Sequence, residues 1–222
     1  MNLERAIANI KRDMGYKQTG DSEIIDCIAD AQEQLETSWP GELELPWFLL
    51  SERSSTSQLG NEERLLLPSD FILEFEGDAL WLQLENGGER RLWKYDADDL
   101  RSQVSQYSDQ ALQHALQLSR FSYALTGDYF RIFPKPDTAQ TYKMIYYQRQ
   151  TVMTDPSEEN RWLKYAPWVL IGAAGAEMCM GARDREAKAH FEAKKAAALQ
   201  SISTFTLERK YANRRMAMGE TL

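Results

Sequence analysis

The residues best suited to metal or nucleophilic chemistry, two cysteines and two histidines, are far apart in this sequence. Cys27 and Cys179 have no CxxC spacing, and His114 and His190 each lie in a helical pattern without a second ligand at a suitable distance. A structural zinc site needs four ligands in short, regular spacings. We therefore expect buried free thiols in a reducing compartment and solvated or interfacial histidines, and we predict no metal and no cofactor.

Carboxylates are abundant, but none of their spacings specifies general acid–base catalysis. Asp96, Asp98 and Asp99 crowd one predicted helix start, and Glu158 and Glu159 precede another. A helix dipole favours negative charge at such positions, so we predict capping roles, with a metal or acid–base role as the alternative. The sequence has no phosphate-binding glycine loop ahead of a helix, no GxSxG elbow, no HExxH motif and no EF-hand loop. We predict no catalytic residue.

Charge is unevenly distributed along the 222 residues, which carry a net charge of −8. Residues 1–160 hold 15 basic and 28 acidic side chains, a net of −13, whereas residues 161–222 hold 11 and 6, a net of +5. The acidic balance argues against a dedicated nucleic-acid binder, and the 27% charged and 11% aromatic residues argue against disorder. An acidic body with a basic end favours attraction between unlike parts of neighbouring molecules or partners.

Helical periodicity marks both ends of the sequence. Apolar residues recur every three or four positions in residues 2–14 and about 22–37, which predicts an N-terminal helix pair. Residues 161–180 and 184–211 are predicted as two long helices, the first of them buried because residues 166–182 form the most apolar run. That run is too short and contains Pro167 and Glu177, so it does not predict a membrane span, and the charged N-terminus does not resemble a signal peptide. Small side chains in this helix predict close approach of another backbone and are our candidates for a subunit interface: Gly172, Ala173, Gly175 and Ala176.

The middle of the sequence is typical of short strands. Hairpins are predicted for residues 79–84 with 89–93 and for residues 121–125 with 129–133, and residues 141–149 form a further strand. Residues 51–63 are predicted as a polar loop, and residues 95–107 as a helix that 108–119 extend or follow. Aromatic residues in the strands predict a core, and alternation places some on an exposed face that a subunit could cover. They are Trp81, Trp93, Tyr123, Tyr129, Phe130, Phe133, Tyr142, Tyr146 and Tyr147.

These patterns predict an α+β fold. We expect a helical bundle, made of the N-terminal helix pair plus two long C-terminal helices, with an inserted antiparallel β region and a C-terminal extension. The predicted parts are residues 1–42 and 156–206 for the helices of the bundle, 43–155 for the mixed β-rich insertion, and 207–222 for the extension.

Residues 207–222, which we call the arm, lack a core pattern. Two interpretations stay open: a frayed terminus, or a peptide that becomes ordered on a partner. The second is favoured by basic, aromatic and methionine side chains, which are frequent at interfaces, and contact with nucleic acid is a weaker alternative. The candidate docking residues are Arg209, Lys210, Tyr211, Arg214, Arg215, Met216 and Met218.

The order of these pieces resembles the adaptor, or head-to-tail connector, proteins of tailed bacteriophages. The resemblance covers about residues 67–198 and includes an LP-x-D-F element at Leu67, Pro68, Asp70 and Phe71. It continues with the hairpin GDYFRIFPKPD, the strand YKMIYYQR and the helix that begins WLKYAPWVLIGAAGAE. The polar loop at residues 52–63 has no counterpart in this pattern.

The resemblance implies a structural, non-enzymatic protein of the virion neck, assembled in the host cytoplasm. In such families, copies form a ring, usually of twelve, beneath the portal protein, and a C-terminal extension docks onto the portal. The β region faces the next tail or nozzle protein, and DNA passes through the channel without specific binding. The arm would then be the portal-docking segment, and acidic side chains in the channel would repel DNA phosphates. The alternatives are another neck or tail-completion protein, a bacterial regulatory protein with an arm, or a soluble enzyme with an unrecognised site.

Overall fold

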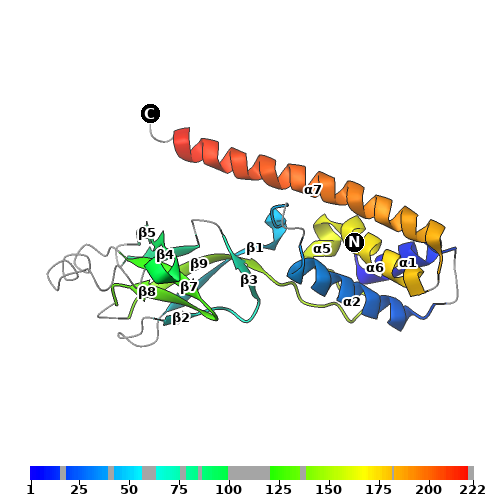
Figure 1. The fold of residues 1–222 in the computed structure, drawn as a ribbon, viewed down its shortest axis with the longest axis horizontal. Helices are drawn as coiled ribbons and strands as arrows, with labels where there is room; N and C mark the ends of the chain where they lie inside the picture. The colour runs from blue at the N-terminus through cyan, green and yellow to red at the C-terminus, as the bar shows by residue number, and fades with distance from the viewer. Residues whose placement is uncertain are drawn as a thin grey trace. The chain divides into compact units, whose positions relative to one another are not determined.

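The computed structural model describes residues 1–15, 19–39, 43–56, 64–75, 79–84, 87–99, 121–135, 139–181 and 183–219, without the side chains of residues 56 and 210–219. The chain forms two compact units (Figure 1). The helical unit comprises Met1–Leu49 and Arg149–Leu222, and the β unit comprises Leu50–Gln148. The helical unit is therefore built from two separate stretches of sequence. The predicted α+β class is confirmed.

The two N-terminal helices form where the apolar spacing predicts them. Helix α1 spans Leu3–Asp13, and the Asn2 side chain caps it by accepting a hydrogen bond from the Arg5 amide. Backbone carbonyls of Pro156 and Glu158 accept from the amides of Glu4 and Leu3, so the turn at residues 155–159 completes this cap. Helix α2 spans Asp21–Thr37 and buries apolar residues at spacings of four, three and four: Ile24, Ile28, Ala31 and Leu35.

Helix α6 lies at the centre of the helical unit. It spans Pro167–Gly181 and contacts α1 and α2, the short helix α5 at Arg161–Tyr165, and helix α7 at Arg185–Gly219 (Figure 1). The single helix predicted for residues 161–180 is wrong at Ala166. The Pro167 ring disfavours helical backbone at the preceding residue and lacks an N–H group, so α5 ends and α6 begins there. No helix among the described residues is long and apolar enough to cross a membrane.

A buried polar network joins the two stretches of the helical unit. Glu36 of α2 is 6% exposed, and its Oε1 accepts from the Trp162 indole N–H at 2.8 Å and the Gln150 amide at 3.1 Å. Gln32 donates to the Gln150 carbonyl at 2.7 Å and accepts from Asn160 at 2.7 Å. Burial raises the pKa of Glu36 above its ordinary value, although the hydrogen bonds from Trp162 and Gln150 act against the shift. The segment returning from the β unit is thereby fixed to α2.

The β unit contains two sheets. The first has the order β1 (Leu50–Thr56), β9 (Thr141–Gln148), β4 (Leu80–Gln83) and β5 (Glu89–Arg91), with β3 (Phe71–Glu74) also pairing with β9. The second has the order β2 (Arg64–Leu66), β8 (Tyr129–Phe133), β7 (Ser122–Thr126) and β6 (Trp93–Lys94). All pairs are antiparallel except β6 with β7. The two predicted hairpins are confirmed, and their turns contain Gly87 and Gly127 with positive φ.

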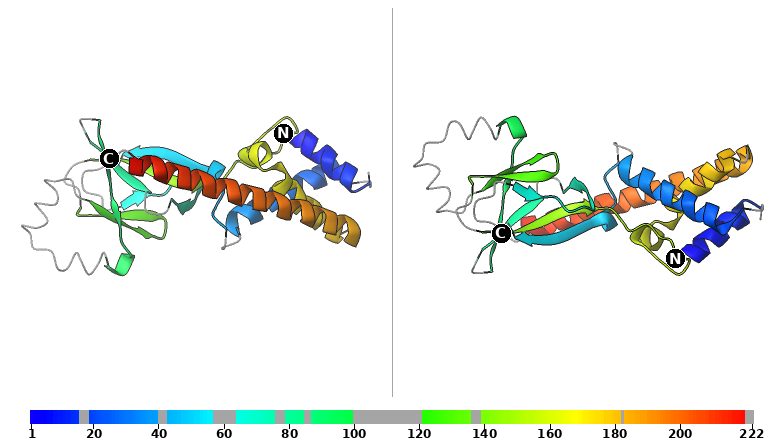
Figure 2. Two further views of the ribbon diagram at one scale, coloured as in Figure 1. Left: turned by 90° about the horizontal axis from the view of Figure 1, so that it is seen from above. Right: turned by 90° about the horizontal axis from the view of Figure 1, so that it is seen from below.

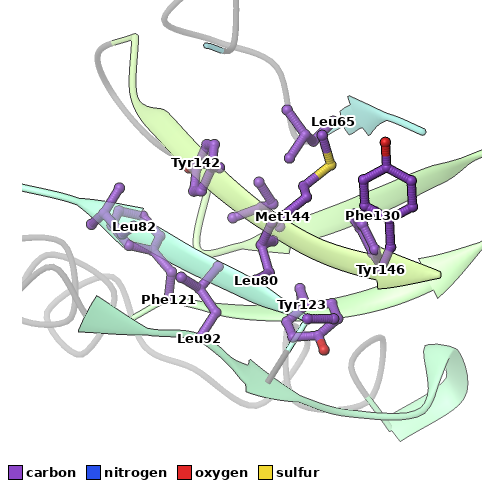
Figure 3. Close-up of a cluster of buried hydrophobic side chains, with 12 residues drawn as sticks. Leu65, Leu80, Leu82, Leu92, Phe121, Tyr123, Phe130, Tyr142, Met144 and Tyr146 are labelled. Carbon is purple, nitrogen blue, oxygen red and sulfur yellow. The ribbon is translucent and has the colours of Figure 1, made fainter. Parts of the chain in front are cut away.

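The core of the β unit contains side chains from both sheets (Figure 3). Tyr123, Phe130, Tyr142 and Tyr146 are buried in it, as the strand alternation predicts. Trp93 is 64% exposed, which confirms that some strand aromatics point away from the core. A buried carboxylate links the sheets: Glu74 of β3 forms an ion pair with Lys94 of β6 and accepts from the Tyr123 hydroxyl of β7 at 3.3 Å.

The structure differs from the loop predicted at residues 51–63 and describes only part of the helix predicted at residues 95–107. Residues 51–56 are not a loop but most of β1, which pairs with β9 from Leu50↔Tyr147 to Thr56↔Thr141. Backbone hydrogen bonds stabilise this strand, and an outer strand tolerates polar side chains. Residues 57–63 lie outside the described residues. Of the helix predicted for 95–107 and its extension to 119, residues 97–99 are helical and 100–120 lie outside the described part of the chain.

The raised pKa of Glu36 predicts how stability depends on pH. The folded state binds the proton more tightly than the unfolded chain, whose glutamate pKa is about 4.3. The contribution of Glu36 is therefore fully present below that pH and is lost as pH rises through the folded pKa. We expect the free energy of unfolding of the natural protein, minus that of Glu36→Gln, to decrease between pH 4 and pH 7 in urea titrations. Glu33→Gln is the matched control, because Glu33 is exposed on the same helix. A difference that stays constant or increases with pH would contradict the prediction.

Candidate interaction surface

Helix α7 extends through most of the arm. The helix predicted to end near Tyr211 continues to Gly219, and the left view in Figure 2 shows it without interruption. The sequence from Arg185 to Met218 contains neither proline nor glycine, and extending an existing helix costs little compared with nucleating a new one. The backbone of residues 207–219 is therefore helical. Residues 220–222 and the side chains of the predicted docking residues from Lys210 onward lie outside the described part.

The base of the arm packs on an aromatic platform of the same unit, formed by Trp47, Phe48 and Tyr165. The Arg209 guanidinium carbon lies 3.7 Å from the centroid of the Trp47 ring and 5.4 Å from that of Phe205. The Trp47 and Phe205 rings are themselves 6.1 Å apart. A guanidinium within about 6 Å of an aromatic face is attracted to it electrostatically. Arg209, a predicted docking residue, thus also has a contact within its own chain.

Trp47 is held by a chain of ring contacts that reaches the buried network around Glu36. It belongs to the 3-10 turn η1 at Trp47–Leu49, and its ring lies 4.9 Å from Tyr165 of α5. The next residue, Phe48, packs edge-on against Trp162 at 5.1 Å, and its carbonyl accepts from Arg161 at 2.9 Å. Trp162 is fully buried and donates to Glu36. The platform under the arm is therefore connected to the interior of the unit.

A groove of about 660 Å³ lies between α7 and this platform. Trp47, Phe48 and Tyr165 form one wall, and α7 supplies the other. The α7 wall carries small and polar side chains together with Ile202 and Phe205, and among the side chains that the structure describes Glu208 is the carboxylate on it. Among the described side chains that line the groove, the titratable ones are Tyr165 and Glu208.

Two of the four predicted interface residues are used within the chain. A Cβ on Gly172 would lie 2.8 Å from the Lys195 Cβ and 2.9 Å from the Phe191 carbonyl oxygen, and one on Gly175 would lie 2.5 Å from the Phe191 ring. The close approach predicted at this segment is thus made by α7 of the same molecule. Ala173 and Ala176 are half-buried, and a role for this helix at a subunit interface stays a prediction.

The residues considered for metal or nucleophilic chemistry do not form a metal site within the part of the chain that the structure describes. Cys27 is half-buried and Cys179 buried, both as free thiols, and burial followed by the charges of Glu177 and Asp30 raises the pKa of Cys27. His190 is solvated, as predicted, and His114 lies outside the described residues. Among the residues that the structure describes, no three His, Cys, Asp or Glu side chains are grouped in a way that could hold a metal ion.

His190 does face a charged contact that the sequence did not indicate. Its Nε2 lies 3.8 Å from the Asp13 carboxylate, which pairs with Lys194 Nζ at 2.6 Å. Burial acts to raise the pKa of Asp13, but hydrogen bonds from Lys194 and Arg12 outweigh it, and the pKa lies below its ordinary value. Lys194 also lies over the Trp168 ring, at 4.4 Å from its centroid. These contacts fix α7 to α1 and α6.

The carboxylates predicted to cap the helix at residue 161 have a different role. The Asn160 side chain caps α5, accepting from the Leu163 amide at 3.0 Å. Glu158 instead closes the preceding turn by accepting from the amides of Thr154 and Asp155, and these hydrogen bonds lower its pKa. Of the carboxylates at the other predicted helix start, Asp98 and Asp99 lie in the helical residues 97–99 and Asp96 precedes them.

The LP-x-D-F element has a structural role in the β unit. Its Asp70 accepts from the Tyr146 hydroxyl at 3.0 Å and from the Gln148 amide group at 2.7 Å, both on β9. Phe71 stacks on Tyr146 with ring centroids 5.7 Å apart. The element therefore positions β3 against β9. Packing within the β unit explains why Asp70 and Phe71 occupy these positions.

Comparison with protein families matches residues 1–219 to the family described as SU10 adaptor protein. The match extends over the helical unit, the β unit and all but the last three residues of the arm. A search of curated proteins found no match to this chain.

The close contact between α6 and α7 predicts that neither glycine tolerates a methyl group. Gly172→Ala and Gly175→Ala each gain about 1 kcal/mol of helix propensity but force backbone or an aromatic ring to move, which costs about 1–3 kcal/mol or more. We expect each variant to lower the free energy of unfolding by about 1–2 kcal/mol in urea titrations.

Gly20→Ala is the matched control. A Cβ there would meet only the Ser22 hydroxyl, at 3.7 Å, so we expect a change of less than about 1 kcal/mol. If Gly172→Ala and Gly175→Ala were as stable as this control, the close packing would not contribute to stability as described.

Proposed function

Since this chain belongs to the SU10 adaptor protein family, a family of phage adaptors, we propose that it is a structural protein of the virion neck that joins the portal to the tail. In this proposal, copies of the chain form a ring of twelve beneath the portal protein. The arm at residues 207–222 docks onto the portal. DNA passes through the channel of the ring without specific binding.

The family match carries this proposal, because it extends from residue 1 to residue 219 and so includes both units and the arm. Charge supports it as well. The basic residues 161–222 contain the arm, whereas residues 1–160 are strongly acidic. Opposite charges on different parts of one chain favour head-to-tail contacts between copies, and contacts of that kind can close into a ring. An acidic surface facing the channel would repel DNA phosphates.

The groove beside α7 supports a structural role over a catalytic one. Its described lining is mostly aromatic, aliphatic or hydroxyl-bearing, with the carboxylate of Glu208 at the base of the arm. Surfaces of this composition suit adhesion, since aromatic side chains provide large contact areas at low entropic cost. We propose that the β unit faces the next tail or nozzle protein, with Trp93 among its exposed residues.

Removal of the arm beyond Arg209 tests the proposed docking. A chain that ends at Arg209 keeps every described side-chain contact of α7, so we expect its thermal midpoint to match that of the natural chain and its far-UV circular dichroism to lose only the signal of helical residues 210–219. We expect it to lose binding to the portal protein in a pull-down. A chain that lacks only residues 220–222 is the control and should bind. If the chain ending at Arg209 bound the portal normally, the arm would not be the docking segment.

Charge reversal tests the electrostatic part of the docking. We expect Arg214→Glu with Arg215→Glu to weaken portal binding about tenfold at low salt and to reduce the salt dependence of the affinity, because two attractive charges become repulsive. The measurement is a titration of portal against adaptor at several ionic strengths.

A matched control makes the same change of net charge at the opposite end of α7. Arg185→Glu with Lys188→Glu introduces two acidic residues in the first turn of the helix, where the dipole favours them. We expect this control to bind the portal with unchanged salt dependence. Equal weakening by both pairs would indicate that net charge alone, and no local contact of the arm, governs binding.

A further inference from the structure

Helix α7 is attached to the rest of the helical unit at two separated places. Near its start, Phe191 and Lys195 pack on Gly172 and Gly175 of α6, and Lys194 pairs with Asp13. Further along, Phe205 and Arg209 contact Trp47. Between these places Ala197, Gln200, Ser201 and Thr204 face the groove. Two supports along a rigid helix determine its direction, and the groove leaves room for that direction to change if the second support is lost.

The second support brings two side chains of α7, Phe205 and Arg209, onto the single ring of Trp47, and Thr206 between them is buried. The Trp47 ring packs against Tyr165. Its neighbour Phe48 packs against Trp162 and accepts a hydrogen bond from Arg161 through its carbonyl. Arg209 lies over the Trp47 ring at 3.7 Å and is the last residue of α7 whose side chain the structure describes. Ten further helical residues, 210–219, follow it and extend about 15 Å at 1.5 Å per residue. Any tilt at Arg209 is therefore magnified at the end of the arm.

We propose that Trp47 and Arg209 form a clamp that sets the direction in which the arm leaves the helical unit, and that portal docking requires this direction. The inference rests on the proposed function, because it assigns two positioning residues to the proposed docking segment. Without the clamp the arm samples several directions. The apparent affinity for the portal is then the intrinsic affinity multiplied by the fraction of molecules whose arm points correctly.

Distance measurements within the helical unit test the first half of the proposal. We attach spin labels to Glu33→Cys on α2 and Asn213→Cys on α7, in a Cys27→Ser background. Pulsed electron paramagnetic resonance then measures the distance between the two labels, which depends on the direction of the arm. We expect one narrow distance distribution for the natural clamp and a broad one for Trp47→Ala and for Arg209→Gln. Trp47→Phe keeps an aromatic ring and Arg209→Lys keeps a cation, so we expect the distance distribution of each of these variants to stay narrow. A narrow distribution in all four variants would overturn the clamp.

Portal affinity of the unlabelled variants tests the second half. We expect Trp47→Ala and Arg209→Gln to bind about tenfold more weakly, and Trp47→Phe and Arg209→Lys to bind within about twofold of the natural chain. Trp47→Ala leaves the Arg209 charge in place, so weaker binding by this variant cannot come from a lost contact between Arg209 and the portal. If the Trp47→Ala variant lost its helical circular dichroism signal, the test of the clamp would rest on Arg209→Gln, because Arg209 is exposed and its replacement does not disturb the interior.

The outcomes separate the clamp from the docking itself. A broad distribution with unchanged portal affinity overturns the positioning role, while the proposed function stands as long as the chain ending at Arg209 fails to bind. If that shortened chain binds normally, the proposed docking fails, and the positioning role fails with it even where the distance distributions behave as expected. Broadening and weaker binding together, both reversed by the conservative variants, support the clamp.

Discussion

The hydrogen bonds to the buried Glu36 carboxylate hold together a helical unit whose two halves are far apart in the sequence. A buried carboxylate is costly unless donors satisfy it, and Trp162 and Gln150 supply them from the returning segment. Trp162 then supports Phe48, and Phe48 adjoins Trp47 at the base of the arm. The position of the arm therefore depends, through a series of contacts, on a polar group deep in the unit.

The β unit can be inserted into the helical unit because it begins and ends at one place. Its first strand and its last strand are hydrogen-bonded neighbours, with Leu50 opposite Tyr147. The chain thus leaves the helical unit at Leu49 and returns at Arg149 through adjacent backbone positions. Two neighbouring connections place little restriction on either unit, so each can keep its own core. This arrangement explains why the helices of the helical unit come from residues 3–37 and 161–219, on either side of the β unit in the sequence.

Elements specified by local pattern could be predicted from the sequence, and elements specified by distant contacts could not. The periodicity of α1 and α2 and the glycines of the two hairpins correctly located those elements. Strand β1 was missed because its backbone pairing with β9 stabilises it and its side chains are polar. Pro167 carried a local signal for the break between α5 and α6 that the apolar run concealed. Glu36, Trp47 and the Asp13 contact gave no signal, because their partners lie more than 100 residues away in the sequence.

The helical backbone of the arm alters the energetics expected of docking. A peptide that becomes ordered only on its partner loses conformational entropy at that moment, which reduces its affinity for a given contact area. Helix α7 is formed through Gly219, so the backbone entropy of the arm is already lost when the chain folds. In the proposed docking the arm would then bind as a preformed helix in a groove. A rigid helix cannot adapt its path to the partner, and its direction then matters as much as its side chains. The contact between Arg209 and Trp47 acts on that direction, because it is the last described side-chain attachment along α7.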